Sequence, residues 1–411
     1  MAKERKKPTT EQQVLTDLSS LAAATGGQVL SECDPVRYYI DTGNLAVNYV
    51  ISGRFFGGGV PGGKIIEIYG PSSSGKSYWG TNILRGTQAI DGIPIYLDCE
   101  NAINRDFAAI ASHIDINKII RYTPESLEKV FAKIYSVIRA VREKYPKRPL
   151  VFVYDSLSAS PCDRELRETD LPEDPTKEQW KKIVGAKEQP GERARICSRE
   201  FRKLETLLEK LDVTLVVINQ TRMKIGVLYG NPETTSGGLA LEFYAGVRLR
   251  TQAQKKIENS KLGSIIGVNL KIQNKKNRCF KPYVEAEEVQ LFFDKGVNPM
   301  SGLLGMLKQA GRIERVNNKG LWQINDPWAG GNVITFTTSL EKGMPVEPLF
   351  KCPSVVDAKD EDEIKNYLAI FQSAIDQSAS EETTEKEIKD DSLDGPDEVD
   401  RAVEAIMKSQ Q

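Results

Sequence analysis

The residues best suited to chemistry lie in one short run, Gly70 to Ser77, which fits the spacing G-x-x-x-x-G-K-[ST]. In this pattern, backbone N–H groups at a helix start wrap phosphate oxygens. Lys76 would reach the β- and γ-phosphates, and the Ser77 hydroxyl would ligate Mg²⁺. A strand-like run precedes the segment and a proline-free run follows it, which favours a nucleotide site over a chance match in a linker. The predicted nucleotide contacts here are Gly70, Pro71, Ser72, Ser73, Ser74, Gly75, Lys76, Ser77 and Tyr78.

Polar side chains follow three other apolar runs. Asp155 ends one of them, where a carboxylate would support Mg²⁺. Asp98 and Glu100 end a second run, and we take Glu100 as the acid that orients the attacking water. Gln220 ends a third run, and its amide can both donate to and accept from a γ-phosphate. From the residues alone, a solvated acid at the end of a strand remains the alternative for Glu100.

Two basic features suit nucleic acid. The segment 222–238 mixes cations, apolar side chains and glycines, so it can pair phosphates and insert between bases. Its predicted DNA contacts are Arg222, Met223, Lys224, Ile225, Gly226, Asn231, Gly237 and Gly238. Arg195, Arg199 and Arg202 recur along one face of an expected helix. An ordinary mobile loop and a solvated helix face are the alternatives.

Composition limits the class of protein. The chain has 411 residues, 40% hydrophobic and 27% charged, which suits a globular protein of more than one domain. It shows no apolar run near ~20 residues and no signal peptide, so we expect a cytoplasmic protein without a membrane partner. Six scattered cysteines and one histidine argue against a zinc cluster. Residues 351–411 carry 17 acidic and 7 basic side chains, which leaves an excess of basic residues in the rest.

The order of elements predicts an α/β fold. Near-continuous apolar strands indicate burial on both faces, hence a mostly parallel, twisted sheet flanked by helices. More polar strands at the end should extend the sheet antiparallel. The expected strands are 64–69, 94–98, 118–122, 149–154, 213–219, 245–251, 265–272 and 286–293; the expected helices are 10–24, 76–90, 124–144 and 193–211. Residues 161–190 are expected to form a long loop.

Taken together, these motifs resemble the bacterial RecA strand-exchange proteins over roughly residues 10–310. The most specific segments are 218–226, 230–235, 237–238 and 243–245, with 67–71 and 98–103 in support. The resemblance implies a P-loop NTPase core, with ATP and Mg²⁺ held between subunits of a helical filament on single-stranded DNA. It also implies DNA-dependent ATP hydrolysis, pairing with homologous duplex DNA and strand exchange in recombination and repair. Single-strand-binding and mediator proteins are further partners that the resemblance implies.

The resemblance also assigns roles. Glu100 would activate water, and Gln220 would couple the γ-phosphate to the DNA loop. Phe107 would stack on adenine, and Asn104 would lie at the nucleotide. Lys276 and Arg278 would reach the γ-phosphate held by the neighbouring subunit. Further implied contacts are Arg195 and Arg202 with DNA, and the helix 10–24 and Phe243 with the adjacent subunit.

The implied domains are a disordered start (1–9), an N-terminal oligomerisation segment (10–59), the ATPase core (60–298) with DNA loops 157–192 and 222–238, a smaller α+β module (299–376) and an acidic, largely disordered tail (377–411). The chain departs from the family at Ser72, Ser77 and Pro190, and residues 311–411 match poorly. Such divergence would suit a phage-encoded relative acting in the host cytoplasm. A regulator without an active filament and a hexameric helicase-type motor are the alternative functions.

Overall fold

The structure is a computed structural model that describes residues 10–27, 29–30, 36–101, 112–169, 191–223, 233–259, 263–311, 313–316, 321–324 and 335–337. The chain divides into two units, Met1–Ile313 and Glu314–Gln411. Several predicted site residues lie outside the described ranges: Asn104, Phe107, Lys224, Ile225, Gly226 and Asn231. The predicted disordered start and acidic tail also lie outside them.

A large mixed sheet forms the centre of the first unit, and its strands run in the order β12-β11-β10-β9-β3-β7-β6-β4-β5. Neighbouring strands from β9 to β5 are parallel, whereas β10, β11 and β12 extend the sheet antiparallel, as predicted. The strands are β3 (Ile65–Gly70), β4 (Ile93–Asp98), β5 (Ile120–Tyr122), β6 (Leu150–Asp155), β7 (Val213–Met223), β9 (Val247–Glu258), β10 (Ile265–Asn277), β11 (Glu285–Phe292) and β12 (Gly296–Val297).

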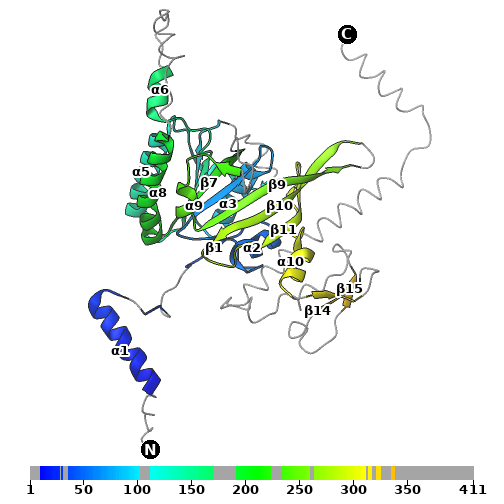
Figure 1. The fold of residues 1–411 in the computed structure, drawn as a ribbon, viewed down its shortest axis with the longest axis horizontal. Helices are drawn as coiled ribbons and strands as arrows, with labels where there is room; N and C mark the ends of the chain where they lie inside the picture. Colours follow the sequence, from blue (N-terminus) through cyan, green and yellow to red (C-terminus); the bar gives the residue numbers. More distant parts are fainter. Residues whose placement is uncertain are drawn as a thin grey trace, which may run out of the picture. The chain divides into compact units, whose positions relative to one another are not determined.

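Helices cover both faces of this sheet (Figure 1). Helices α5 (Leu127–Lys144) and α8 (Glu192–Leu211) lie side by side and share one core with Phe152 and Tyr154 of β6. Helix α3 (Lys76–Ala89) covers the other face, where a Cβ at Gly80 would lie 2.9 Å from Val153. Alternate residues of β6 therefore face opposite helical layers, which explains its unbroken apolar sequence.

Smaller elements complete the described chain. The predicted N-terminal helix is α1 (Thr10–Thr25), and the Asn44 side chain caps α2 (Leu45–Ser52) by accepting from the Val47 N–H. The others are β1 (Tyr39–Ile40), β2 (Val60–Pro61), the 3₁₀ turn η2 (Ile116–Lys118), α9 (Ala240–Tyr244) and α10 (Leu303–Gln309). A small sheet follows, made of β13 (Ile313–Arg315), β14 (Leu321–Ile324) and β15 (Thr335–Thr337).

Two predicted loops contain regular structure. Within 157–192, the chain forms α6 (Asp163–Thr169), because Glu165 accepts from the Cys162 N–H and so satisfies a helix-start donor. Within 222–238, β7 continues to Met223 and β8 (Glu233–Thr235) returns antiparallel to it. Cross-strand pairing thus replaces loop structure at both ends of this segment. Among the described residues, every helix is too short or too polar to cross a lipid bilayer.

Candidate functional site

The predicted phosphate loop joins β3 to α3. Gly75 precedes the helix with a φ of 77°, and Ser73 also has a positive φ of 59°, so the loop turns tightly enough to direct backbone N–H groups to one point. A Cβ at Gly70 would lie 2.1 Å from the Thr251 carbonyl oxygen, so only glycine fits there. The Thr251 hydroxyl donates to the Ser74 carbonyl at 2.6 Å and ties the loop to β9.

Lys76, Ser77 and Asp155 meet at this loop. The Lys76 ammonium is buried and donates to the Pro71 carbonyl at 2.5 Å, which folds it across the loop. Burial lowers the pKa of Lys76, although the nearby Asp155 and Glu100 carboxylates oppose the effect. Ser77 hydrogen bonds to the Asp155 carboxylate. The structure therefore brings these three predicted site residues together.

Glu100 and Gln220 lie together beside the loop. The Gln220 Nε2 donates to Glu100 Oε1 at 3.3 Å, and the Ser156 hydroxyl donates to the same carboxylate oxygen. Asp98 has a different partner, because Arg121 donates to its Oδ2 through Nε at 3.0 Å and Nη2 at 2.7 Å. Within the described ranges, the hydrogen bonds to the Glu100 carboxylate come from uncharged donors, whereas Asp98 is paired with a guanidinium, so Glu100 is better suited than Asp98 to accept a proton.

The donor set suits Mg²⁺ bound together with a nucleotide. Ser77 and Asp155 offer hard oxygen ligands, and the Asp155 and Glu100 carboxylates both lie near Lys76, so a divalent cation would offset the excess negative charge. No group of three or more acidic, histidine or cysteine side chains in the described ranges forms a metal site by itself. The metal would therefore share its coordination with phosphate oxygens, as Mg²⁺ commonly does.

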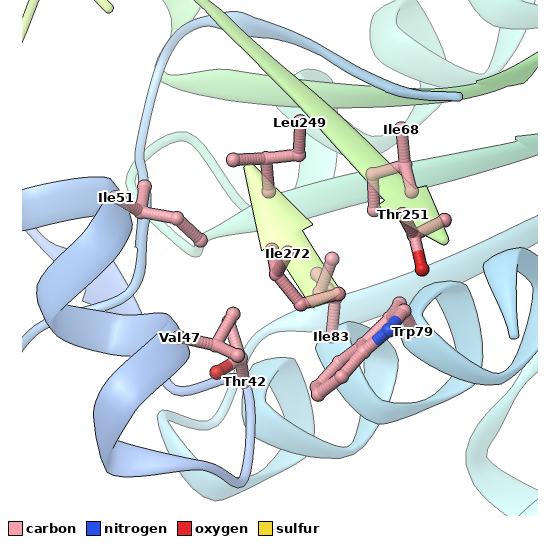
Figure 2. Close-up of a pocket in the computed structure, with 9 residues that line it drawn as sticks. All are labelled: Thr42, Val47, Ile51, Ile68, Trp79, Ile83, Leu249, Thr251 and Ile272. Carbon is pink, nitrogen blue, oxygen red and sulfur yellow. The ribbon is translucent and has the colours of Figure 1, made fainter. Parts of the chain in front are cut away.

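A small apolar cavity lies close to the phosphate loop (Figure 2). Trp79 and Thr251 line it, and the indole N–H of Trp79 has no hydrogen-bond partner in the described part of the chain. The cavity is too apolar for a polyphosphate and belongs to the packing beneath the site. Tyr78, a predicted nucleotide contact, is buried, and its hydroxyl accepts from the Val297 N–H at 2.6 Å. Its side chain thus supports the strand β12.

The attachment points of the two predicted DNA loops meet. A Cβ at Gly237 would lie 2.8 Å from the Leu157 side chain, and one at Gly238 would lie 2.8 Å from Ala194. Leu157 follows β6, Ala194 belongs to the first turn of α8, and the two glycines follow β8. Both glycines have positive φ values, which suit this close approach. The ends of 157–192 and 222–238 are therefore neighbours.

The predicted arginine stripe lies on the exposed face of α8. Arg195, Arg199 and Arg202 are exposed, whereas Phe201 and Leu204 on the other face are buried. Arg199 pairs with Glu200 at 2.6 Å, and Arg202 donates to the Tyr244 hydroxyl at 3.1 Å. Arg222 is also exposed, at the end of β7.

Lys276 and Arg278 lie away from the phosphate loop of their own chain. Both donate to the Phe243 carbonyl at the end of α9, each at 2.8 Å. Lys276 of β10 lies opposite Arg248 of β9, and Arg248 lies opposite Glu67 of β3, which is three residues before Gly70. Burial, followed by the charges of Arg278 and Arg248, lowers the pKa of Lys276 to about 8.

Sequence reasoning missed several contacts that hold the site together. Tyr96 donates to Asp155 Oδ2 at 2.7 Å, and Glu67 is buried between Asn219, at 3.0 Å, and Arg248, at 2.5 Å. Asn219 in turn accepts from the Gln220 N–H at 3.0 Å. The buried polar residues inside apolar strands, such as Glu67, were the available signal, because such residues require partners.

Comparisons with known proteins identify chains of similar sequence. A family model described as the RecA N-terminal domain matches residues 31–166 and 175–298. The chain is 32% identical over 288 residues to Protein RecA of Thermosynechococcus vestitus, which covers 69% of this chain and 73% of the relative. It is 32% identical over 302 residues to Protein RecA of Trichodesmium erythraeum (72% and 74% covered) and 31% identical over 280 residues to that of Thermus thermophilus (68% and 74% covered).

Proposed function

Because the chain belongs to the RecA family, we propose that it is a DNA-dependent ATPase that forms a helical filament on single-stranded DNA and exchanges strands with homologous duplex DNA. ATP and Mg²⁺ would bind at the phosphate loop, with Lys76 on the phosphates and Ser77 and Asp155 at the metal. Glu100 would activate the attacking water. The bound nucleotide supplies the phosphoanhydride that is cleaved, and the chain supplies positioning and charge.

The contact between Gln220 and Glu100 is the observation that carries this proposal. Gln220 belongs to β7, and two residues later the same strand enters the segment that we assign to DNA. A γ-phosphate beside Glu100 would compete for the Gln220 amide and so change the position of the end of β7. The nucleotide state and the affinity for DNA would thereby be linked through the Gln220 side chain.

The placement of Lys276 and Arg278 supports a site shared between subunits. Lys276 lies level with Glu67 of β3, which is three residues, or about 10 Å along the strand, before Gly70. Lys276 and Arg278 are therefore distant from the phosphate loop of their own chain. Their ammonium and guanidinium groups gather at the exposed residue Phe243. We infer that this surface meets the phosphate loop of the next protomer, together with α1, whose Val14, Leu18 and Leu21 are exposed.

Two measurements on one sample test the function. ATP hydrolysis is measured with and without single-stranded DNA, and the same mixture is imaged by electron microscopy. We expect DNA to stimulate turnover and filaments to form when nucleotide and DNA are both present. Turnover without filaments would favour a different motor, and filaments without turnover would favour a regulator.

The variant Lys76→Ala is the control for the nucleotide site. It removes the main cation expected on the phosphates, so ATP turnover should be lost in both conditions. Strand exchange is then measured with a labelled duplex that matches the bound strand and one that does not. Release of a labelled strand only from the matching duplex supports the recombinase, and equal release from both duplexes contradicts it.

A further inference from the structure

One buried phenol touches the proposed magnesium site from inside the core. Tyr96 lies in β4 with only 2% of its surface exposed, and its hydroxyl donates to Asp155 Oδ2 at 2.7 Å. Asp155 is itself only 4% exposed. A hydrogen bond between two such buried groups is ordered by the packing around both of them.

The strand register explains how Tyr96 reaches this carboxylate. Tyr96 pairs with Val153 and Asp98 pairs with Asp155, so the four side chains point to the same face of the sheet. This is the face covered by α3, which carries Ser77. The phenol therefore approaches Asp155 from the interior, while Ser77 approaches the same carboxylate from the helix.

We propose that Tyr96 is a positioning residue, which holds the Asp155 carboxylate in the orientation that receives Mg²⁺ with the nucleotide. A carboxylate next to Asp98 and Glu100 would otherwise rotate between several orientations and would have to be ordered when the metal binds. Because the Tyr96 hydroxyl already orders the Asp155 carboxylate, metal binding does not have to supply the free energy for that ordering. Groups that hydrogen bond to a metal ligand commonly change metal affinity or activity by about 10–100-fold when they are removed.

This inference rests on the proposed function, because it assumes that Asp155 serves a magnesium–nucleotide complex. It adds a residue outside the phosphate loop to that site. Tyr96 touches neither the nucleotide nor the metal, so its effect would be exerted entirely through Asp155. The variant Tyr96→Phe tests it, since it removes the hydroxyl and keeps the ring that fills the core.

Tyr154→Phe is a matched control on the neighbouring strand. Tyr154 is fully buried, and its hydroxyl donates to the Ser160 hydroxyl at 2.6 Å. It faces the opposite layer, among the side chains of the α5 and α8 core. Each variant loses one buried hydroxyl and one hydrogen bond, but only Tyr96→Phe changes the surroundings of Asp155.

Binding of a fluorescent, non-hydrolysable ATP analogue is measured across a magnesium titration without DNA, so the result does not depend on turnover. We expect the magnesium concentration at half-maximal binding to rise about tenfold in Tyr96→Phe and to stay at the wild-type value in Tyr154→Phe. In excess EDTA, the affinity for the analogue should be equal in all three proteins. Urea unfolding confirms that both variants are folded.

Three results would overturn the inference. An unchanged magnesium midpoint in Tyr96→Phe would show that the hydroxyl does not position Asp155. Equal shifts in the two variants would assign the effect to core packing. If the wild-type protein binds the analogue without any dependence on magnesium, the proposed function fails as well, and this outcome is distinct from the other two.

Discussion

Gln220 Nε2 lies 3.3 Å from Glu100 Oε1, and this contact joins β7, near its C-terminal end, to the segment that follows β4. The two strands are separated by β6 in the sheet. Glu100 also accepts from Ser156, which follows β6. Three parallel strands therefore deliver one polar side chain each to the same point, at the edge where their carboxyl ends meet.

Loss of the Gln220 amide should uncouple DNA from ATP turnover. In Gln220→Ala, nothing at this position can respond to the γ-phosphate, so the ratio of turnover with DNA to turnover without it should fall about tenfold. Steady-state hydrolysis at saturating ATP measures the ratio. Gln252→Ala, which removes an exposed amide on β9, is the control. An unchanged ratio in Gln220→Ala would contradict the coupling role.

Glu100 and Asp98 should differ in what their loss changes. Glu100→Gln keeps an acceptor for Ser156 but cannot take a proton, so turnover should fall by about 10²–10³ while ATP binding remains. Asp98→Asn instead weakens the pair with Arg121, so the free energy of unfolding should fall by about 1–3 kcal/mol. Hydrolysis and urea unfolding are measured on both variants. Exchanged effects would mean that Asp98 is the catalytic base.

Much of the fold followed from local patterns, whereas the contacts within the site did not. The unbroken apolar run 215–218 predicted a buried strand, and the glycine spacing at 70–75 predicted the loop, because both depend on residues close in sequence. The partner of Asp98 depends on β5 lying beside β4, and the partner of Asp155 depends on the face of β4 that carries Tyr96. Such strand order and register arise from long-range packing, so Tyr96 looked like an ordinary core residue.

Filament assembly should depend on pH through Lys276. Its pKa of about 8 lies below the usual value for lysine, so its charge is lost as the pH rises through 8. If Lys276 binds a phosphate of the next protomer, assembly with an ATP analogue should weaken by up to about tenfold per pH unit above 8. Light scattering from pH 7 to 9 measures assembly.

Arginine variants provide the controls for this pH dependence. Lys276→Arg keeps its charge throughout this range, so assembly should no longer weaken as the pH rises. Lys271→Arg should retain the wild-type profile, because hydrogen bonds with Glu285 and Glu287 raise the pKa of Lys271. The same slope in wild type and Lys276→Arg would assign the dependence to another group.

Gly237 should be required for close packing at the attachment points of the two predicted DNA loops. It has a φ of 86°, and a Cβ there would lie 2.8 Å from buried Leu157, so Gly237→Ala should lower the free energy of unfolding by about 2–4 kcal/mol. Gly191→Ala shares the positive φ, at 91°, but meets no described atom within 4 Å. Gly191→Ala should lower the free energy of unfolding only through the strain of a positive φ, by about 1–2 kcal/mol. Equal losses of unfolding free energy in the two variants, measured by urea unfolding, would contradict a steric role for Gly237.

The arginine stripe should contribute to DNA affinity through phosphate contacts, and salt dependence measures such contacts directly. Arg195 is exposed beside Ala194, where the attachment points of the two predicted DNA loops meet. We therefore expect Arg195→Ala to reduce the slope of log affinity against log salt by about 0.7 for single-stranded DNA. Lys210→Ala removes a cation from the far end of the same helix, about 22 Å away, and should leave the slope unchanged. Fluorescence anisotropy with a labelled oligonucleotide gives both slopes. If the two variants reduce the slope equally, the effect reflects net charge, and Arg195 makes no phosphate contact of its own.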